Sequence, residues 1–175
     1  MVVLASVLVV FLICKLTKFK NVLDYGGGDG LFTRIMRDYK INCYNYDKHS
    51  ETIYSKKFNI PDFNKPDLVT SFEAIEHFAD PMTEFEKIFQ NTPEMIILTT
   101  KIYENQNKDW DYFEFQTGQH IFFYTKNAFK YLAKKFNYNL VFLELGYILF
   151  YSNKYSKRKL LLYMLKNFFI RKKFM

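Results

Sequence analysis

The stretch Val22–Gly30 reads VLDYGGGDG, a short apolar run that ends in an aspartate and breaks into a glycine-rich turn. Residues 31–39 follow it with a helical pattern, so the stretch predicts a buried strand, a tight turn and a helix. Glycine tolerates positive φ and, because it lacks Cβ, lets a ligand lie against the backbone. The stretch therefore predicts a site for a nucleotide-like ligand.

The spacing of the glycines narrows the choice of ligand. A dinucleotide fingerprint has the pattern G-x-G-x-x-G, but counting from Gly26 and Gly28 its third glycine falls at Leu31. A P-loop needs the sequence Gly-Lys-Ser/Thr, and no lysine lies in this turn. The pattern that fits is D-x-G-x-G-x-G, formed by Asp24, Gly26, Gly28 and Gly30.

The rest of the chain alternates strands with helices, which predicts an α/β fold with a mostly parallel sheet and helices on both faces. Four segments have the composition of strands: 21–25, 41–46, 67–72 and 95–100. Five segments have a helical pattern: 31–39, 51–58, 73–78, 81–90 and 125–136. The run 140–151 predicts an antiparallel strand pair at the C-terminal end, with a hairpin around Gly146.

The length of 175 residues suits one domain, and its charge is unevenly distributed. From Tyr151 onward there are eight Lys or Arg and no acid, which leaves 25 − 8 = 17 basic against 18 acidic residues before it. A nearly neutral body does not predict a groove that tracks phosphates, so nucleic acid is an unlikely partner. We divide the chain into an apolar N-terminal segment, 1–20, a domain, 21–152, and a basic C-terminal helix or tail, 153–175.

The two cysteines, Cys14 and Cys43, stand alone, which fits a reducing cytoplasm and argues against structural zinc. The run Val2–Cys14 is apolar apart from Ser6 and shorter than the roughly 20 residues that span a bilayer. A buried helix or strand is the favoured interpretation of this run, and a membrane anchor is the alternative.

Asp47 lies 23 residues after Asp24, at the end of the second predicted strand. A carboxylate there can accept hydrogen bonds from both hydroxyls of a ribose. Through VLDYGGGDG and YNYDKHS the sequence resembles class I S-adenosylmethionine-dependent methyltransferases, which have a Rossmann-like fold. The resemblance implies that the methyl donor, S-adenosylmethionine, is held by the turn and by the acid: Asp24, Tyr25, Gly26, Gly27, Gly28, Gly30 and Asp47. A generic glycine turn followed by a surface aspartate is the alternative.

A second cluster lies in SFEAIEHF, residues 71–78. Offsets of three and four place Glu73, Glu76 and His77 on one face of the predicted helix, near the carboxyl ends of the strands. Two crowded carboxylates repel each other unless a proton or a cation lies between them. A divalent cation with oxygen and imidazole ligands would satisfy both.

The E-x-x-E-H order also resembles metal-assisted O-methyltransferases, including the small-RNA 2′-O-methyltransferases, which add a further histidine after the next strand. The resemblance implies a site for Mg²⁺ or another divalent cation with four ligands: Glu73, Glu76, His77 and His120. A solvated helix start beside a loop histidine is the alternative. Without a metal, His77 or His120 could act as the general base.

The wider sequence, 21–145, resembles bacterial methyltransferases of polysaccharide and glycan biosynthesis. The resemblance implies O-methylation of a sugar, a glycan precursor or another small metabolite. Trp110, Tyr112 and Phe115, in the long connection 101–119, are candidates for the wall of the acceptor pocket. The alternatives are a domain that binds the methyl donor without turnover and a membrane-surface methyltransferase that acts on a lipid-linked acceptor. Leu31 disfavours a nicotinamide-dependent oxidoreductase.

The C-terminal segment KYSKRKLLLYMLKNFFIRKKFM, 154–175, places basic clusters around the apolar run Leu160–Ile170. A run of eleven residues is too short to cross a bilayer as a helix, but it can lie in the bilayer surface against anionic lipid. A terminal helix docked on the sheet is the alternative. We therefore expect a cytoplasmic protein with a possible peripheral membrane contact through this tail.

Overall fold

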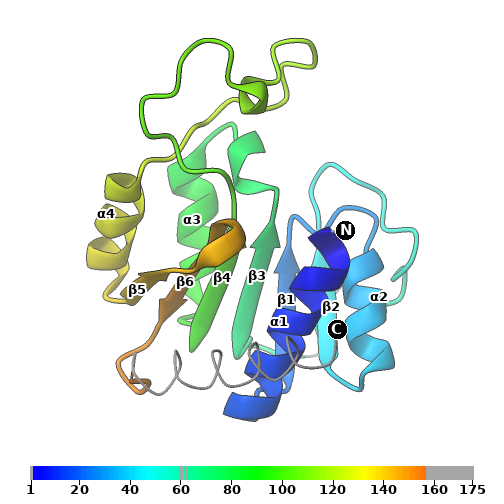
Figure 1. Cartoon of the computed structure of the whole chain (residues 1–175). Coiled ribbons are helices and arrows are strands. Elements are labelled where there is room, and N and C mark those ends of the chain that lie inside the picture. The colour runs from blue at the N-terminus through cyan, green and yellow to red at the C-terminus, as the bar shows by residue number, and fades with distance from the viewer. Residues whose placement is uncertain (1, 60, 62, 157–175) are drawn as a thin grey trace, which may run out of the picture.

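The computed structural model describes residues 2–59, 61 and 63–156, and six strands form one sheet in the order β2-β1-β3-β4-β6-β5. The first four strands are parallel, and β6 is antiparallel to both β4 and β5 (Figure 1). This arrangement confirms the predicted mostly parallel sheet with an antiparallel strand pair. The strands are β1 (Asn21–Tyr25), β2 (Asn42–Tyr46), β3 (Leu68–Phe72), β4 (Met95–Thr99), β5 (Asn139–Phe142) and β6 (Tyr147–Tyr151).

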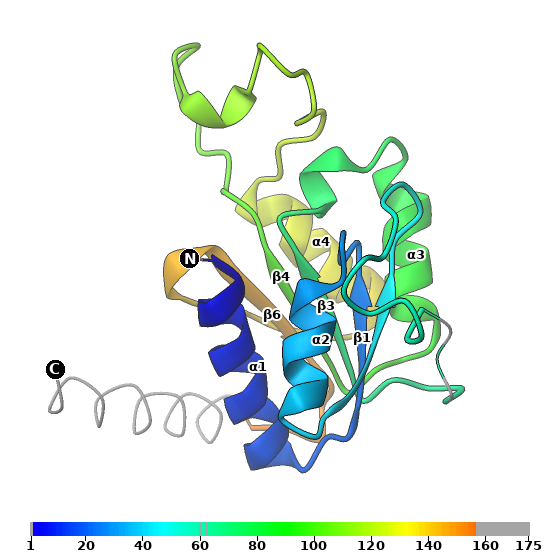
Figure 2. The same ribbon diagram turned by 90° about the vertical axis from the view of Figure 1, so that its right-hand side faces the viewer.

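Four α-helices cover the two faces of the sheet (Figures 1 and 2). One face carries α1 (Val2–Thr17) and α2 (Leu31–Asp38), and the other carries α3 (Pro81–Gln90) and α4 (Lys126–Phe136). Three short 3-10 turns lie in the connections: η1 (Ile75–His77), η2 (Asp111–Phe113) and η3 (Glu144–Gly146).

The core consists of two apolar layers that the central strands separate. In β4, Met95 and Ile97 pack toward α1 and α2, whereas Ile96 and Leu98 pack toward α3 and α4. Side chains alternate between the faces of a strand, so a strand covered on both sides must be apolar throughout. This explains the unbroken run MIILT, every residue of which is buried.

The predicted N-terminal apolar segment forms α1 and is part of the core. Val7, Val10 and Ile13 are buried in the same layer as α2, and the Ser6 hydroxyl forms a buried hydrogen bond of 3.0 Å with the Tyr147 hydroxyl. Within the part of the chain that the structure describes, no helix has the length and apolar composition needed to cross a membrane. From residue 157 on, the predicted C-terminal helix or tail lies outside the described residues.

Two predicted helices are wrong. Segment 51–58 forms bends and turns, because two of its amides bond to the glycine turn and not within a helix. The amides of Ile53 and Tyr54 both donate to the Asp29 carbonyl. Segment 73–78 contains only the 3-10 turn η1. Glu73 has a φ of +47°, and its amide donates to the Thr99 hydroxyl, so the backbone turns there before η1 begins.

Candidate functional site

The glycine turn joins β1 to α2 at the carboxyl edge of the sheet. Gly26, Gly28 and Gly30 have φ values of +74°, +55° and +83°, which other L-residues rarely adopt. The amide of Gly26 donates to the Tyr46 carbonyl at the end of β2, with a distance of 2.7 Å. The turn is therefore tied to the neighbouring strand and has the backbone conformation that its sequence predicts.

Gly27 is the most tightly packed residue of this turn. A Cβ at this position would lie 2.0 Å from Oδ1 of Asn45 and 2.3 Å from Oδ2 of Asp24, closer than packed atoms approach. A Cβ at Gly28, in contrast, would meet no protein atom within 4 Å. The turn is thus filled beneath Gly27 and open above Gly28, which leaves room for a ligand against its backbone.

Asp24 lies beneath the turn and is only 2% exposed. Its Oδ1 accepts a hydrogen bond of 2.7 Å from the Thr70 hydroxyl on β3. Burial raises the pKa of Asp24 to about 7; the Thr70 bond lowers it, and the charge of Asp47 raises it. The predicted role of Asp24 in holding the methyl donor stays a prediction.

Asn45, which the sequence reading missed, packs beside Asp24 and supports the turn from β2. Its Nδ2 donates to the Gly28 carbonyl at 3.1 Å and to the Thr52 hydroxyl at 2.9 Å. Its Oδ1 is buried and has no hydrogen-bond partner among the described residues. The sequence gives only a weak signal for this role of Asn45, because an asparagine shortly before an aspartate at the end of a strand also suits a surface turn.

Asp47 follows β2 and is tied to the glycine turn. Its Oδ2 accepts from the Gly28 amide at 2.9 Å, and its Oδ1 accepts from the amides of His49 and Ser50. These bonds orient the carboxylate and leave one acceptor position free on Oδ2, since each oxygen can accept two hydrogen bonds.

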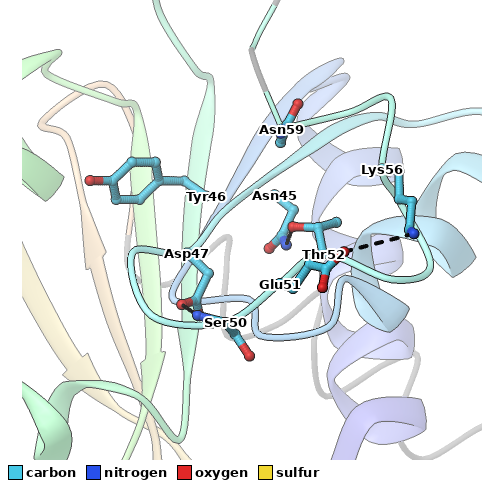
Figure 3. A pocket seen from close by; sticks show the side chains of 8 residues that line it. All are labelled: Asn45, Tyr46, Asp47, Ser50, Glu51, Thr52, Lys56 and Asn59. Atoms are coloured by element: carbon cyan, nitrogen blue, oxygen red, sulfur yellow. Dashed lines mark hydrogen bonds and ion pairs between the residues drawn. The ribbon is translucent and has the colours of Figure 1, made fainter.

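A hollow of about 470 Å³ opens beside Asp47 (Figure 3). It lies between the end of β2 and the loop 50–59, and its polar lining suits a ligand with several hydroxyl or amine groups. The lining residues are Asn45, Tyr46, Asp47, Ser50, Glu51, Thr52, Lys56 and Asn59.

Tyr25 is not among the residues that line this hollow. Its ring packs against Tyr46, with centroids 4.9 Å apart, and its hydroxyl donates a hydrogen bond to Glu84 on α3. Lys87 donates to the other oxygen of Glu84 at 2.7 Å. The Tyr25 side chain thus anchors α3 to the end of β1, and only its backbone faces the turn.

A second group of polar side chains lies along the same edge of the sheet. Ligand atoms of Glu76, His77 and His120 lie within 4.8 Å of one another. Glu76 is completely buried; its Oε1 accepts from the Tyr112 hydroxyl at 2.6 Å, and its Oε2 has no hydrogen-bond partner among the described residues. A buried carboxylate oxygen without a partner is costly unless a proton, a ligand or a cation satisfies it.

The two imidazoles of this group are oriented by backbone carbonyls. Nδ1 of His77 lies 2.8 Å from the Gln119 carbonyl, and Nδ1 of His120 lies 2.7 Å from the Tyr112 carbonyl. A carbonyl only accepts, so Nδ1 carries the proton in each neutral ring and Nε2 is left with a free lone pair. Metal-binding histidines are commonly held in this way.

Main-chain hydrogen bonds hold the His120 segment against η1. The amides of Ile121 and Phe122 donate to the Glu76 carbonyl at 3.0 and 3.1 Å, and the Tyr124 hydroxyl donates to the Ile75 carbonyl. The structure therefore brings His120 beside Glu76 and His77, although His120 lies more than forty positions later in the sequence.

Glu73 does not belong to this group of ligand atoms. It is exposed on the turn before η1, so the predicted helical face shared with Glu76 and His77 is wrong. Glu73 still influences its neighbour: burial raises the pKa of Glu76, the Tyr112 bond lowers it, and the charge of Glu73 raises it further. A ligand role for Glu73 stays a prediction.

The aromatic residues of the long connection form their own cluster above the sheet. Trp110 contacts the rings of Tyr103, Phe113 and Phe123. Tyr112 is buried beneath them, and its hydroxyl bonds to Glu76. Phe115 is 77% exposed and stacks on Phe113, with ring centroids 5.2 Å apart. Of the three predicted acceptor-facing rings, Phe115 is the one that is largely exposed.

Solved structures of methyltransferases resemble this fold. The methyltransferase domain of bacterial CtHen1 has a TM-score of 0.59 and 21% identity, covering 83% of this chain and 97% of that one. Magnesium protoporphyrin IX methyltransferase from Synechocystis PCC 6803, solved with bound S-adenosylhomocysteine, has a TM-score of 0.63 and 10% identity, covering 85% and 83%. At these identities the likeness concerns the fold alone.

A family model assigns the chain to a protein family more directly than the solved structures do. The model described as "Methyltransferase domain" matches residues 4–143, most of the chain, from α1 through β5. No match was found among curated proteins. The chain therefore belongs to the methyltransferase domain family and has the fold of the S-adenosylmethionine-dependent methyltransferases.

Proposed function

We propose that this protein transfers a methyl group from S-adenosylmethionine to a hydroxyl of a small acceptor, such as a sugar or a glycan precursor. The observation that carries the proposal is the pairing of two sites on one edge of the sheet. The open glycine turn with Asp47 suits an adenosyl ligand, and the nearby Glu76, His77 and His120 suit a hydroxyl that must lose a proton.

The donor site uses backbone more than side chains. The turn above Gly28 is free of protein atoms, so a ligand can approach its main chain closely. The Asp47 carboxylate, held by the Gly28 amide, retains one acceptor position on Oδ2 for a ribose hydroxyl. Bound S-adenosylmethionine would supply an electrophilic methyl group on its sulfonium.

The acceptor site offers two bases. Nε2 of His77 and of His120 has a free lone pair, because each Nδ1 bonds to a carbonyl. Either atom can accept the proton that the acceptor hydroxyl loses as its oxygen attacks the methyl carbon. His77 is exposed and so is open to an incoming acceptor, whereas the more buried Glu76 stabilises a positive charge on either ring.

The same residues fit a divalent cation. Glu76 Oε2, which lacks a partner among the described residues, and Nε2 of each histidine would hold it. Two imidazoles and one carboxylate favour a first-row ion such as Mn²⁺ over Mg²⁺, which prefers oxygen ligands. When bound, the cation would lower the pKa of an acceptor hydroxyl.

Gly27→Ala is expected to weaken the binding of S-adenosylhomocysteine, measured by calorimetry, by about tenfold or more, roughly 1.4 kcal/mol. The added methyl would displace Asn45 and Asp24 and move the turn. The control, Gly118→Ala, adds a methyl outside this turn, at a position where no protein atom lies within 4 Å, and should bind normally. Equal affinity in the two variants would contradict this placement of the donor.

Glu76→Gln is expected to weaken Mn²⁺ binding, followed by electron paramagnetic resonance, by about tenfold or more, because it neutralises the one buried carboxylate of the group. Glu114→Gln, which neutralises an exposed carboxylate on the connection between β4 and α4, should leave Mn²⁺ binding unchanged. Methyl transfer that persists after EDTA treatment and metal-free dialysis would exclude the cation and leave the histidines as bases.

Asp24→Asn is expected to change how stability depends on pH. The pKa of Asp24 is about 7 in the folded state, above the value of about 3.9 in the unfolded state. Between these two pH values the folded state therefore binds more protons than the unfolded state. The free energy of unfolding falls as pH rises through this range. The variant, which carries no charge there, should gain stability relative to wild type from pH 4 to pH 8 in urea titrations. Asp109→Asn, an exposed control, should show no such trend; a pH-independent difference for Asp24→Asn would contradict the buried charge.

A further inference from the structure

The outer side of α1 is apolar although it faces away from the core. Val7, Val10 and Ile13 form the buried side, and Leu4, Leu8 and Leu12, spaced four residues apart, lie on the opposite side. Leu4 is 68% exposed, and Leu8 and Leu12 are partly exposed. A surface helix of a globular protein usually carries polar residues on this side, so the apolar stripe Leu4–Leu8–Leu12 indicates a binding surface.

Aromatic and basic side chains extend the stripe. Phe11 of α1 packs against Tyr39, which follows α2 and is largely exposed, with ring centroids 5.1 Å apart. Nζ of Lys15 lies 5.3 Å from the Phe11 ring, and Lys18 and Lys20 are exposed just beyond α1. No acidic residue occurs before Asp24 in the sequence. This surface is therefore both apolar and positively charged.

The described chain ends beside the same surface. The Tyr155 ring packs edge-on against Phe19, just after α1, with centroids 5.8 Å apart. Residues 157–175, which follow, contain seven Lys or Arg, no acid and the apolar run LLLYMLKNFFI. In the sequence, both ends of the chain therefore combine apolar residues with positive charge, and α1 lies on the same face of the sheet as α2 (Figure 2).

We propose that the α1 surface, formed by Leu4, Leu8, Phe11, Leu12 and Tyr39, docks on an anionic membrane. A lipid surface buries apolar side chains, places tyrosine at the headgroups and attracts lysine. The segment 157–175 alone, or a second copy of the chain, would instead bring further cations against Lys15, Lys18 and Lys20 without an acid on α1 to neutralise them.

Flotation of the full chain with phosphatidylcholine vesicles, with and without phosphatidylglycerol, tests this docking. The protein should float with the anionic vesicles, remain behind with the neutral ones, and dissociate as salt rises, because salt screens the lysine charges. Each lysine contributes about 1 kcal/mol near an anionic surface, so Lys18→Ala should weaken binding about fivefold. No flotation with anionic vesicles at low salt would overturn the proposal.

Leu4→Glu separates the α1 surface from the C-terminal segment. It changes an exposed side chain, so the fold should persist in circular dichroism, while binding to anionic vesicles should fall at least tenfold. Tyr131→Glu, which changes a 57% exposed side chain on α4 across the sheet, should bind as wild type does. Unchanged binding of Leu4→Glu, or a dimer that Leu4→Glu dissolves without vesicle binding, would refute the proposed surface.

Discussion

The site depends on close packing beneath Gly27. The carboxylate of Asp24, at the end of β1, and the amide of Asn45, on β2, occupy the space where any side chain at position 27 would lie. The turn can therefore rest on the two strands only because this residue has no Cβ. Asp47, whose carboxylate bonds to the Gly28 amide, then closes the same loop from the end of β2. Three separate segments are thus held in one arrangement.

Two buried carboxylates mark this edge of the sheet, and burial raises the pKa of both. Asp24 is partly satisfied by Thr70, whereas one oxygen of Glu76 has no partner among the described residues. Such groups oppose folding, because each must lose its hydration or hold a proton. Their retention beside an open turn and two oriented imidazoles fits a site arranged for a charged ligand and a proton transfer rather than for stability.

The glycine spacing and the apolar runs predicted the turn, the sheet and its antiparallel end, because these features follow from local backbone and burial preferences. Segments 51–58 and 73–78 were predicted as helices and are not, since long-range bonds decide them: the Asp29 carbonyl takes the amides of Ile53 and Tyr54, and the Thr99 hydroxyl takes that of Glu73. No local sequence pattern predicts that Asn45 supports the glycine turn. His120 was predicted from a resemblance, and its contact with Glu76 depends on main-chain pairing that no short motif encodes.

A crystal structure of the full chain with S-adenosylhomocysteine tests the central claim most directly. The account predicts density for the ligand against the main chain of Gly26–Gly30, with a ribose hydroxyl within hydrogen-bonding distance of Oδ2 of Asp47 and the sulfur directed toward Glu76, His77 and His120. Ligand bound elsewhere on the molecule, or a ribose that does not contact Asp47, would contradict it.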